Sequence, residues 1–179
     1  MDHKFILLLL ILITILISIS YYFQNHFFPQ LIYMNNDPFV FRKLNYNDYS
    51  PEYFQLLKQL TEAEQIDRQK FKEILDEINK NSNIYVLEDI TNKKIVASAT
   101  LIIEHKLIRN GGKVGHLEDV VVDENYRGNN LGKNIVLKII DLAKENGCYK
   151  IIGDCSPELL KFYEKMGFQN KGNQIAIYF

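Results

Sequence analysis

The hydrophobic positions of the chain form short apolar runs and longer stretches that repeat about every 3.6 residues. The short runs, bounded by polar turn residues, predict strands at 39–44, 84–87, 95–104, 117–122, 149–154 and 175–179. The amphipathic stretches predict helices at 51–60, 67–80, 131–146 and 157–166. This order predicts an α/β (mixed α+β) domain, in which helices flank a central mixed sheet of about six strands.

The most informative pattern is a strand that leads through a glycine-bearing loop into an amphipathic helix, at residues 115–133. Gly128 and Gly132 lie in this loop, and glycines let a backbone approach a ligand closely. Backbone N–H groups at a helix N-terminus bind phosphate. The glycine spacing matches neither the P-loop pattern GxxxxGK[ST] nor the Rossmann pattern GxGxxG. The loop is therefore predicted to bind the pyrophosphate of some other carrier molecule.

Two adjacent acids, Glu118 and Asp119, open the apolar run of the same strand. Successive side chains of a strand point to opposite faces, so we expect these two carboxylates on opposite faces of the sheet. At least one of them then needs a partner, because an unpaired buried charge is costly. A solvated strand end is the alternative interpretation.

Residues 5–23 contain no charged side chain and are mostly Leu and Ile. As a helix they would extend about 28 Å at 1.5 Å per residue, close to the hydrocarbon thickness of a bilayer. The competing interpretation is a cleaved signal peptide, with Ser18 and Ser20 before the cleavage site. We expect one N-terminal transmembrane helix. The predicted organisation is an anchor at 1–23, a linker at 24–38 and a globular domain at 39–179.

Composition limits the class of protein and the cellular compartment that the sequence suits. The chain has 179 residues, 47% hydrophobic and 24% charged, which fits one globular domain behind the apolar segment. The net charge of −1 gives no case for nucleic acid. Cys148 and Cys155 flank one predicted strand, which disfavours a disulfide, and no Asn-x-Ser/Thr sequence occurs. These features predict a single-pass membrane protein whose domain lies in the cytosol.

A last motif is Phe162-Tyr163-Glu164-Lys165-Met166-Gly167-Phe168. Together with residues 115–133 and 147–155, it resembles the GNAT superfamily of acetyl-CoA-dependent N-acetyltransferases, and in detail its glucosamine-phosphate branch. The resemblance covers about 39–179. It implies the GNAT acyltransferase fold and the transfer of acetyl from acetyl-CoA to the amine of D-glucosamine 6-phosphate, by direct attack in a ternary complex. The products would be CoA and N-acetyl-D-glucosamine 6-phosphate, for UDP-N-acetylglucosamine synthesis.

The resemblance also implies the residues that bind acetyl-CoA, with no metal involved. The strand around Val120 would pair with the pantetheine arm, and the loop before the helix would hold the pyrophosphate. Asn130 stands where the superfamily usually has Gly. The implied cofactor-binding residues are Val120, Val121, Val122, Arg127, Gly128, Asn129, Asn130, Leu131, Gly132, Lys133, Asp154 and Tyr163.

Three residues are implied in the chemistry. A strand N–H near Val120 would face the thioester oxygen, Tyr163 would donate to the departing thiolate, and Asp154 would order the amine. Taken alone, Tyr163 also suits the core and Asp154 also suits a helix cap. His116 is a candidate general base because histidine titrates near neutrality, with a structural role as the alternative.

The resemblance places the acceptor between acids and cations. The acids would bind the amine and hydroxyls of the sugar, and the cations its phosphate, although loop cations are often merely solvated. Some relatives carry an Arg near the C-terminus where this chain has Tyr178. The implied substrate-binding residues are Thr61, Lys106, Leu107, Ile108, Arg109, Glu118, Asp119, Val120, Tyr149 and Lys150.

Resemblance further implies a homodimer in which the C-terminal strand, 175–179, crosses to the partner's sheet. Two other functions remain open from the residues alone. One is a GNAT enzyme that acetylates a different amine, such as a protein N-terminus or a polyamine. The other is a non-catalytic CoA-binding module at a membrane.

Overall fold

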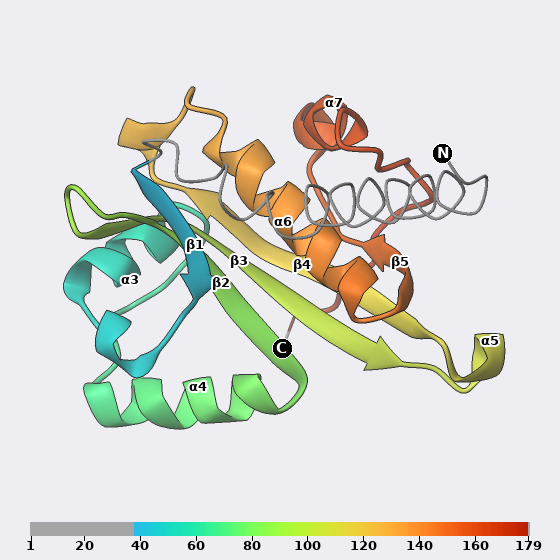
Figure 1. The fold of residues 1–179 in the computed structure, drawn as a ribbon, viewed down its shortest axis with the longest axis horizontal. Coiled ribbons are helices and arrows are strands. Elements are labelled where there is room, and N and C mark those ends of the chain that lie inside the picture. The colour runs from blue at the N-terminus through green and yellow to red at the C-terminus, as the bar shows by residue number, and fades with distance from the viewer. Residues whose placement is uncertain (1–37, 179) are drawn as a thin grey trace, which may run out of the picture. The chain divides into compact units, whose positions relative to one another are not determined.

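The computed structural model describes residues 38–178 (Figure 1). The predicted anchor and linker lie outside this range, so they stay predictions. Within the described residues, no helix combines the length and the apolar character that a membrane crossing requires.

A five-stranded mixed sheet, in the order β1-β2-β3-β4-β5, forms the centre of the domain. Neighbouring strands are antiparallel except β4 and β5, which are parallel. Because a parallel pair needs a crossover, the helix between them lies on one face of the sheet. The strands are β1 (Phe39–Lys43), β2 (Ser82–Asp89), β3 (Lys94–His105), β4 (Lys113–Val122) and β5 (Cys148–Ile152).

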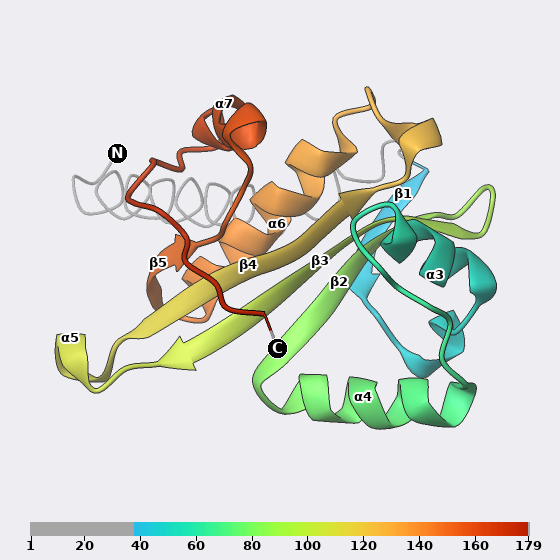
Figure 2. The same ribbon diagram turned by 180° about the vertical axis from the view of Figure 1, so that it is seen from behind.

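Helices cover both faces of this sheet. The crossover helix α6 lies on the face turned toward the reader in Figure 1, whereas Figure 2 shows α3 and α4 on the opposite face. Short turns complete the chain. The helices are α3 (Pro51–Lys58), α4 (Arg68–Asn81), α5 (Ile108–Gly111), α6 (Leu131–Glu145) and α7 (Leu160–Glu164), and the 3₁₀ turns are η1 (Tyr46–Asp48), η2 (Glu124–Tyr126) and η3 (Pro157–Leu159). The predicted arrangement of a central mixed sheet flanked by helices is confirmed.

The helix boundaries follow from local chemistry that the sequence displays. The Ser50 side chain accepts from the N–H of Tyr53 at 3.2 Å, and Asp67 accepts from the N–H of Lys70 at 2.8 Å, so each caps its helix. Gly147 follows the C-terminus of α6 with a φ of +76°, the left-handed conformation typical of that position.

Each face of the sheet has its own hydrophobic core. Leu131, Ile135 and Ile139 of α6 pack against Ala99 and Leu117 of the sheet. A second cluster, which contains Tyr53, Phe54, Phe71, Leu75, Val86 and Val121, fills the space beneath α3 and α4. The two clusters hold the sheet from both sides. The face on which a β4 side chain lies therefore decides which of the two layers of helices it meets.

The predicted sixth strand at 175–179 is wrong for the single chain. Residues 175–178 form no strand, and Ile175 and Tyr178 are 94% and 95% exposed. The alternating apolar pattern is that of a strand, but within the described chain no neighbouring strand offers it backbone hydrogen bonds. Figure 2 accordingly draws this segment as coil.

Candidate active site

A β-bulge interrupts β4 at the two acids. Thr100 pairs with Glu118 and Ser98 with Val121, so Asp119 and Val120 together oppose the single residue between Ser98 and Thr100. Asp119 has a φ of 52°, a left-handed conformation that Asp tolerates better than most residues. Such a bulge bends the strand and increases its twist.

The bulge overturns the expectation that the two acids point to opposite faces. Glu118 lies directly across from Thr100, and directly opposed residues share a face. The Thr100 hydroxyl donates to Asp119 at 3.4 Å, which places Asp119 on this same face. It is the α3 face, because the Tyr53 hydroxyl of α3 lies 3.2 Å from Ser98, two residues before Thr100.

Beyond its first few residues, β4 has a free edge. The pairing of β4 with β5 ends at His116 and Ile152. Gly153 still lies against β4, since a Cβ there would come within 2.9 Å of the Leu117 carbonyl oxygen. From Leu117 to Val122 no strand of the described chain lies on that side of β4. The edge therefore offers backbone groups to an extended ligand arm, in the manner of an added strand.

The loop before α6, residues 127–133, has backbone features that suit an anion, and we call it the anion loop. Asn130 adopts φ 59° and makes no side-chain bond to the helix start, so the first N–H groups of α6 have no cap from it. Asn enters this conformation readily, which accounts for its presence where glycine is usual. Gly128 has φ +88°, and a Cβ on it would meet nothing within 4 Å. An anion can approach this backbone closely.

Buried carboxylates anchor the loop to the β2–β3 hairpin. Asp123 accepts from Lys94 at 2.6 Å and from the N–H of Asn125 at 2.9 Å. Burial alone would raise the pKa of Asp123, but Lys94 and these hydrogen bonds outweigh it and lower that pKa. The Tyr126 hydroxyl donates to Asp89 at 2.9 Å, and the pKa of Asp89 is lowered by its hydrogen bonds, first those from Asn92. Both acids are ionised and hold the loop from one side.

Tyr163 lies beside Cys155, just past the end of β5, and so borders the region next to the unpaired part of β4, residues 117–122, which we call the wedge. Its ring packs edge-on against Phe162 and Phe168, with centroids 5.0 and 5.5 Å away. Phe162 in turn covers Gly132, where a Cβ would lie 3.4 Å from the ring, so α7 rests on the start of α6. Burial, and then the neighbouring Cys155, raise the pKa of Tyr163. Its hydroxyl is therefore protonated at neutral pH and is a donor.

The acids form one electrostatic group at the mouth of the wedge. Burial raises the pKa of Glu118, and the nearby carboxylates of Asp119 and Asp154 raise it further. Asp154 follows the end of β5 and accepts from the Gln174 side chain at 2.9 Å. The group attracts a cation and can take up a proton.

The predicted cations gather elsewhere, at the β3–β4 tip. The Arg109 guanidinium lies 5.5 Å from the ring centroid of Tyr149. The ammonium of Lys150, the next residue after Tyr149, lies 5.9 Å from the same ring centroid. Lys106 instead forms an ion pair with Glu104. Leu107 and Ile108 at the tip are exposed. The tip is about 20 Å from the bulge, since β4 rises 3.3 Å per residue from Lys113 to Asp119.

The predicted residues therefore fall into two groups. Val120–Val122, the loop 127–133, Asp154, Tyr163 and the two acids surround the wedge. Thr61 lies just after α3, on the face of the acids, with its N–H donating to the Leu57 carbonyl at 3.3 Å. Arg109, Lys150 and Tyr149 lie toward the other end of β4, so the single chain does not bring them to the wedge. Lys106 is connected to the acids only indirectly, through Glu104 and His116.

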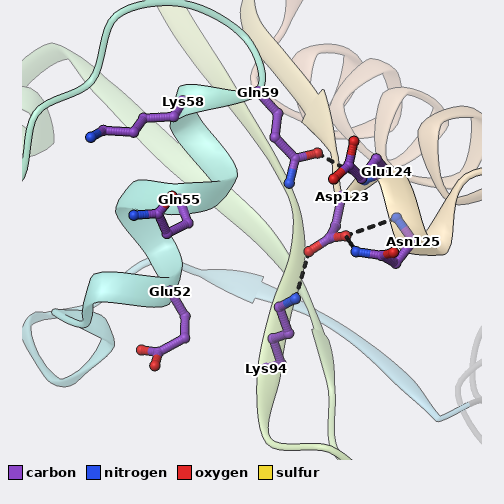
Figure 3. Close-up of a pocket in the computed structure, with 8 residues that line it drawn as sticks. All are labelled: Glu52, Gln55, Lys58, Gln59, Lys94, Asp123, Glu124 and Asn125. Atoms are coloured by element: carbon purple, nitrogen blue, oxygen red, sulfur yellow. Dashed lines mark hydrogen bonds and ion pairs between the residues drawn. The ribbon is translucent and has the colours of Figure 1, made fainter.

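One part of the neighbourhood was missed by sequence reasoning. A hollow of about 440 Å³ lies between α3 and the start of the loop, with Lys94 and Asp123 on its wall (Figure 3). The Gln59 side chain crosses it and accepts from the N–H of Glu124 at 2.8 Å, which ties the segment containing Thr61 to the anion loop. Only folding brings these distant positions together, so no local pattern signals them.

Comparison with known proteins identifies the class. The model of the "Acetyltransferase (GNAT) family" matches residues 43–168. The chain belongs to the GNAT acetyltransferase family, whose members use acetyl-CoA as cosubstrate. The open β4 edge, the anion loop and the protonated tyrosine are consistent with that cosubstrate.

Individual relatives are more specific. The chain is 44% identical over 146 residues to "Glucosamine 6-phosphate N-acetyltransferase 1" of Dictyostelium discoideum, which covers 80% of the chain and 92% of the relative. It is 42% identical over 146 residues to "Glucosamine 6-phosphate N-acetyltransferase" of Arabidopsis thaliana, a match that covers 80% of the chain and 98% of that relative. A crystal structure of glucosamine-6-phosphate N-acetyltransferase from Arabidopsis thaliana superposes with a TM-score of 0.76 at 43% identity, covering 79% of the chain and 98% of that structure.

The anion loop can be tested with two matched glycines. Gly128→Val forces a β-branched residue into a left-handed conformation and fills the empty space above the loop, so we expect acetyl-CoA affinity to fall at least tenfold, about 1.4 kcal/mol. Gly147→Val imposes the same kind of strain, at φ +76°, at the other end of α6. Both variants should lose about 1–2 kcal/mol of stability in denaturant unfolding, but only Gly128→Val should weaken binding in calorimetry. Equal affinities would contradict the assignment of the loop.

Proposed function

We propose that this chain acetylates the amine of D-glucosamine 6-phosphate with acetyl-CoA, giving N-acetyl-D-glucosamine 6-phosphate and CoA. The observation that carries the proposal is the position of Glu118 and Asp119 on one face of the β4 bulge, next to the free edge of the strand. An acidic pair beside a thioester-binding edge suits an acceptor that arrives as an ammonium ion with hydroxyl groups. Relatives of that name match over most of the chain.

The cosubstrate would lie along the wedge. Val120, Val121 and Val122 would pair through their backbones with the pantetheine arm, and the loop 127–133 would hold the pyrophosphate through the N–H groups at the start of α6. An N–H near Val120, freed from regular pairing by the bulge, would face the thioester oxygen and stabilise the charge that develops there.

Direct attack in a ternary complex needs little covalent chemistry from the protein. The neutral amine attacks the thioester carbon, and collapse of the tetrahedral intermediate expels the sulfur. Tyr163 would donate its proton to that sulfur, since its raised pKa keeps the hydroxyl protonated until the basic thiolate departs. Asp154 would orient the amine from the end of β5, next to Glu118.

The phosphate of the acceptor requires cations, and the nearest candidates within one chain are at the wrong end of β4. A hexose phosphate bound at the acids is too short to reach Arg109 at the tip, about 20 Å from Asp119, and the register partner of Lys150, Val114, is about 13 Å from Glu118. A homodimer resolves this conflict if the β3–β4 tip of one subunit reaches the acids of the other. The exposed apolar side chains of Ile175 and Ile177 fit a segment that is covered in such a dimer.

Residues 5–23 would hold the enzyme at a membrane, with the catalytic domain in the cytosol where sugar phosphates and acetyl-CoA are made. The support for this part is the uncharged apolar composition of the segment.

The acceptor is tested by CoA release from the full chain with acetyl-CoA and either glucosamine 6-phosphate or glucosamine. We expect turnover with the phosphorylated sugar and at least a hundredfold lower kcat/KM without the phosphate, because about 3 kcal/mol of charged contacts is lost. Turnover with polyamines or peptide N-termini instead would select another GNAT activity. Tight acetyl-CoA binding with no turnover on any amine would select a binding module.

The role of Tyr163 is tested by Tyr163→Phe, which removes one oxygen from an otherwise apolar contact. We expect kcat to fall by about 10²–10³-fold with acetyl-CoA affinity unchanged, as for loss of an acid that acts only in the transition state. Tyr85→Phe is the matched control, since Tyr85 is also half-buried with a pKa raised by burial, but stacks on Phe41 away from the wedge. An unaltered kcat in the first variant would remove Tyr163 from the mechanism.

The shared site is tested by pairing two damaged subunits. Arg109→Asn removes the guanidinium but suits the left-handed backbone at that residue, where φ is 57°. Coexpressed with Tyr163→Phe, it should restore about a quarter of wild-type turnover, because random pairing leaves one undamaged site in half of the dimers. Activity no greater than that of the two parents would mean that each site is built within one chain.

A further inference from the structure

A row of ionisable side chains leads away from the acids on the α3 face of the sheet. The His116 imidazole lies between two carboxylates, with Nε2 2.9 Å from Oε2 of Glu104 and Nδ1 3.9 Å from Oε1 of Glu118. Lys106 binds the other oxygen of Glu104. Glu104, His116 and Glu118 therefore connect the bulge to the exposed C-terminal end of β3, where 41% of the Glu104 side chain is accessible.

The neighbouring charges make the two carboxylates at the ends of this row different in proton affinity. Lys106, and then His116, lower the pKa of Glu104, so Glu104 is ionised and accepts the Nε2–H of the imidazole. That tautomer leaves the lone pair of Nδ1 toward Glu118. The pKa of Glu118 is raised by burial and by two neighbouring acids, so this carboxylate is the member that most readily takes up a proton from a ligand.

We propose that His116 carries the proton of the substrate ammonium from Glu118 to solvent, an inference that rests on the proposed acetyl transfer. The ammonium gives one proton to the Glu118 carboxylate, which passes it to Nδ1 of His116 through one water that spans the 3.9 Å between them. The imidazolium, held by Glu104, releases the proton to water. The second N–H proton, lost as the tetrahedral intermediate collapses, balances the one that Tyr163 gives to the sulfur. His116 is thus a positioning and relay residue, because it acts through Glu118.

The charges around His116 suit this role. On β3 it faces Glu104, with Lys106 beyond, and on β4 it faces Glu118. The β5 residue in register with it is Ile152, which is uncharged. The imidazole is partly exposed, with 26% of its side chain accessible, so water can remove the proton.

The experiment compares pH profiles of kcat for wild type, His116→Gln and His105→Gln with glucosamine 6-phosphate. Gln retains a donor to Glu104 but cannot titrate. We expect His116→Gln to lose about tenfold in kcat at pH 6.5, less than the about 10²–10⁴-fold of a direct base. At pH 9 an amine with a pKa near the α-amino value of about 8, as expected beside the electron-withdrawing oxygens of a sugar, is already mostly neutral, and the variant should come within about twofold of wild type.

His105 is the matched control, an exposed histidine of β3 next to Glu104 in sequence, so its side chain points to the opposite face. Its variant should follow the wild-type profile. Glu104→Gln, which keeps a hydrogen bond to the imidazole but not the charge, should show a smaller loss of the same pH-dependent form. Acetyl-CoA affinity, unchanged in each variant, verifies folding.

The outcomes separate the relay from the reaction that it serves. An equal loss for His116→Gln at every pH would indicate a structural role and overturn the relay, as would a profile identical to that of wild type. Absence of wild-type turnover with glucosamine 6-phosphate would overturn the proposed function and the relay together.

Discussion

The early end of β5, which leaves β4 unpaired on that side after His116, is the constraint on which the site depends. Two parallel strands ordinarily satisfy each other's backbone along their length, yet here the pairing ends at His116. The bulge at Asp119 and Val120 bends β4 just beyond that point, while the packing of α6 holds the rest of the strand in the core. A row of backbone groups is thereby left for a ligand, and the protein supplies an edge that acetyl-CoA can complete.

The same bulge determines the charge of the site. With regular alternation, Glu118 and Asp119 would lie on opposite faces, and one of them would be directed into the apolar layer beneath α6. The extra residue brings both to the α3 face, where Asp154 joins them. Burial and their mutual repulsion make Glu118 the readiest proton acceptor of the group, so one backbone irregularity gathers the acids on which the proposed site depends.

Contacts from other elements hold both ends of the anion loop. The ionised, buried Asp123 and Asp89 fasten its first residues to the β2–β3 hairpin, and Phe162 presses on Gly132 at its end. A helix N-terminus binds an anion well only when its N–H groups are already aimed, because ordering them on binding would cost affinity. The loop is therefore fixed by contacts outside itself, at both ends.

The sequence by itself determined the mixed α/β class, the four longest helical stretches, the strand–loop–helix unit and the tyrosine motif, because each depends on neighbouring residues and on side-chain period. It did not determine the shared face of the acids, since a bulge is set by the pairing of β4 with β3. Nor did it separate the cations at the tip from the wedge or reveal the contacts of His116 and Gln59. The last predicted strand failed for the same reason: a strand exists only where another backbone lies beside it.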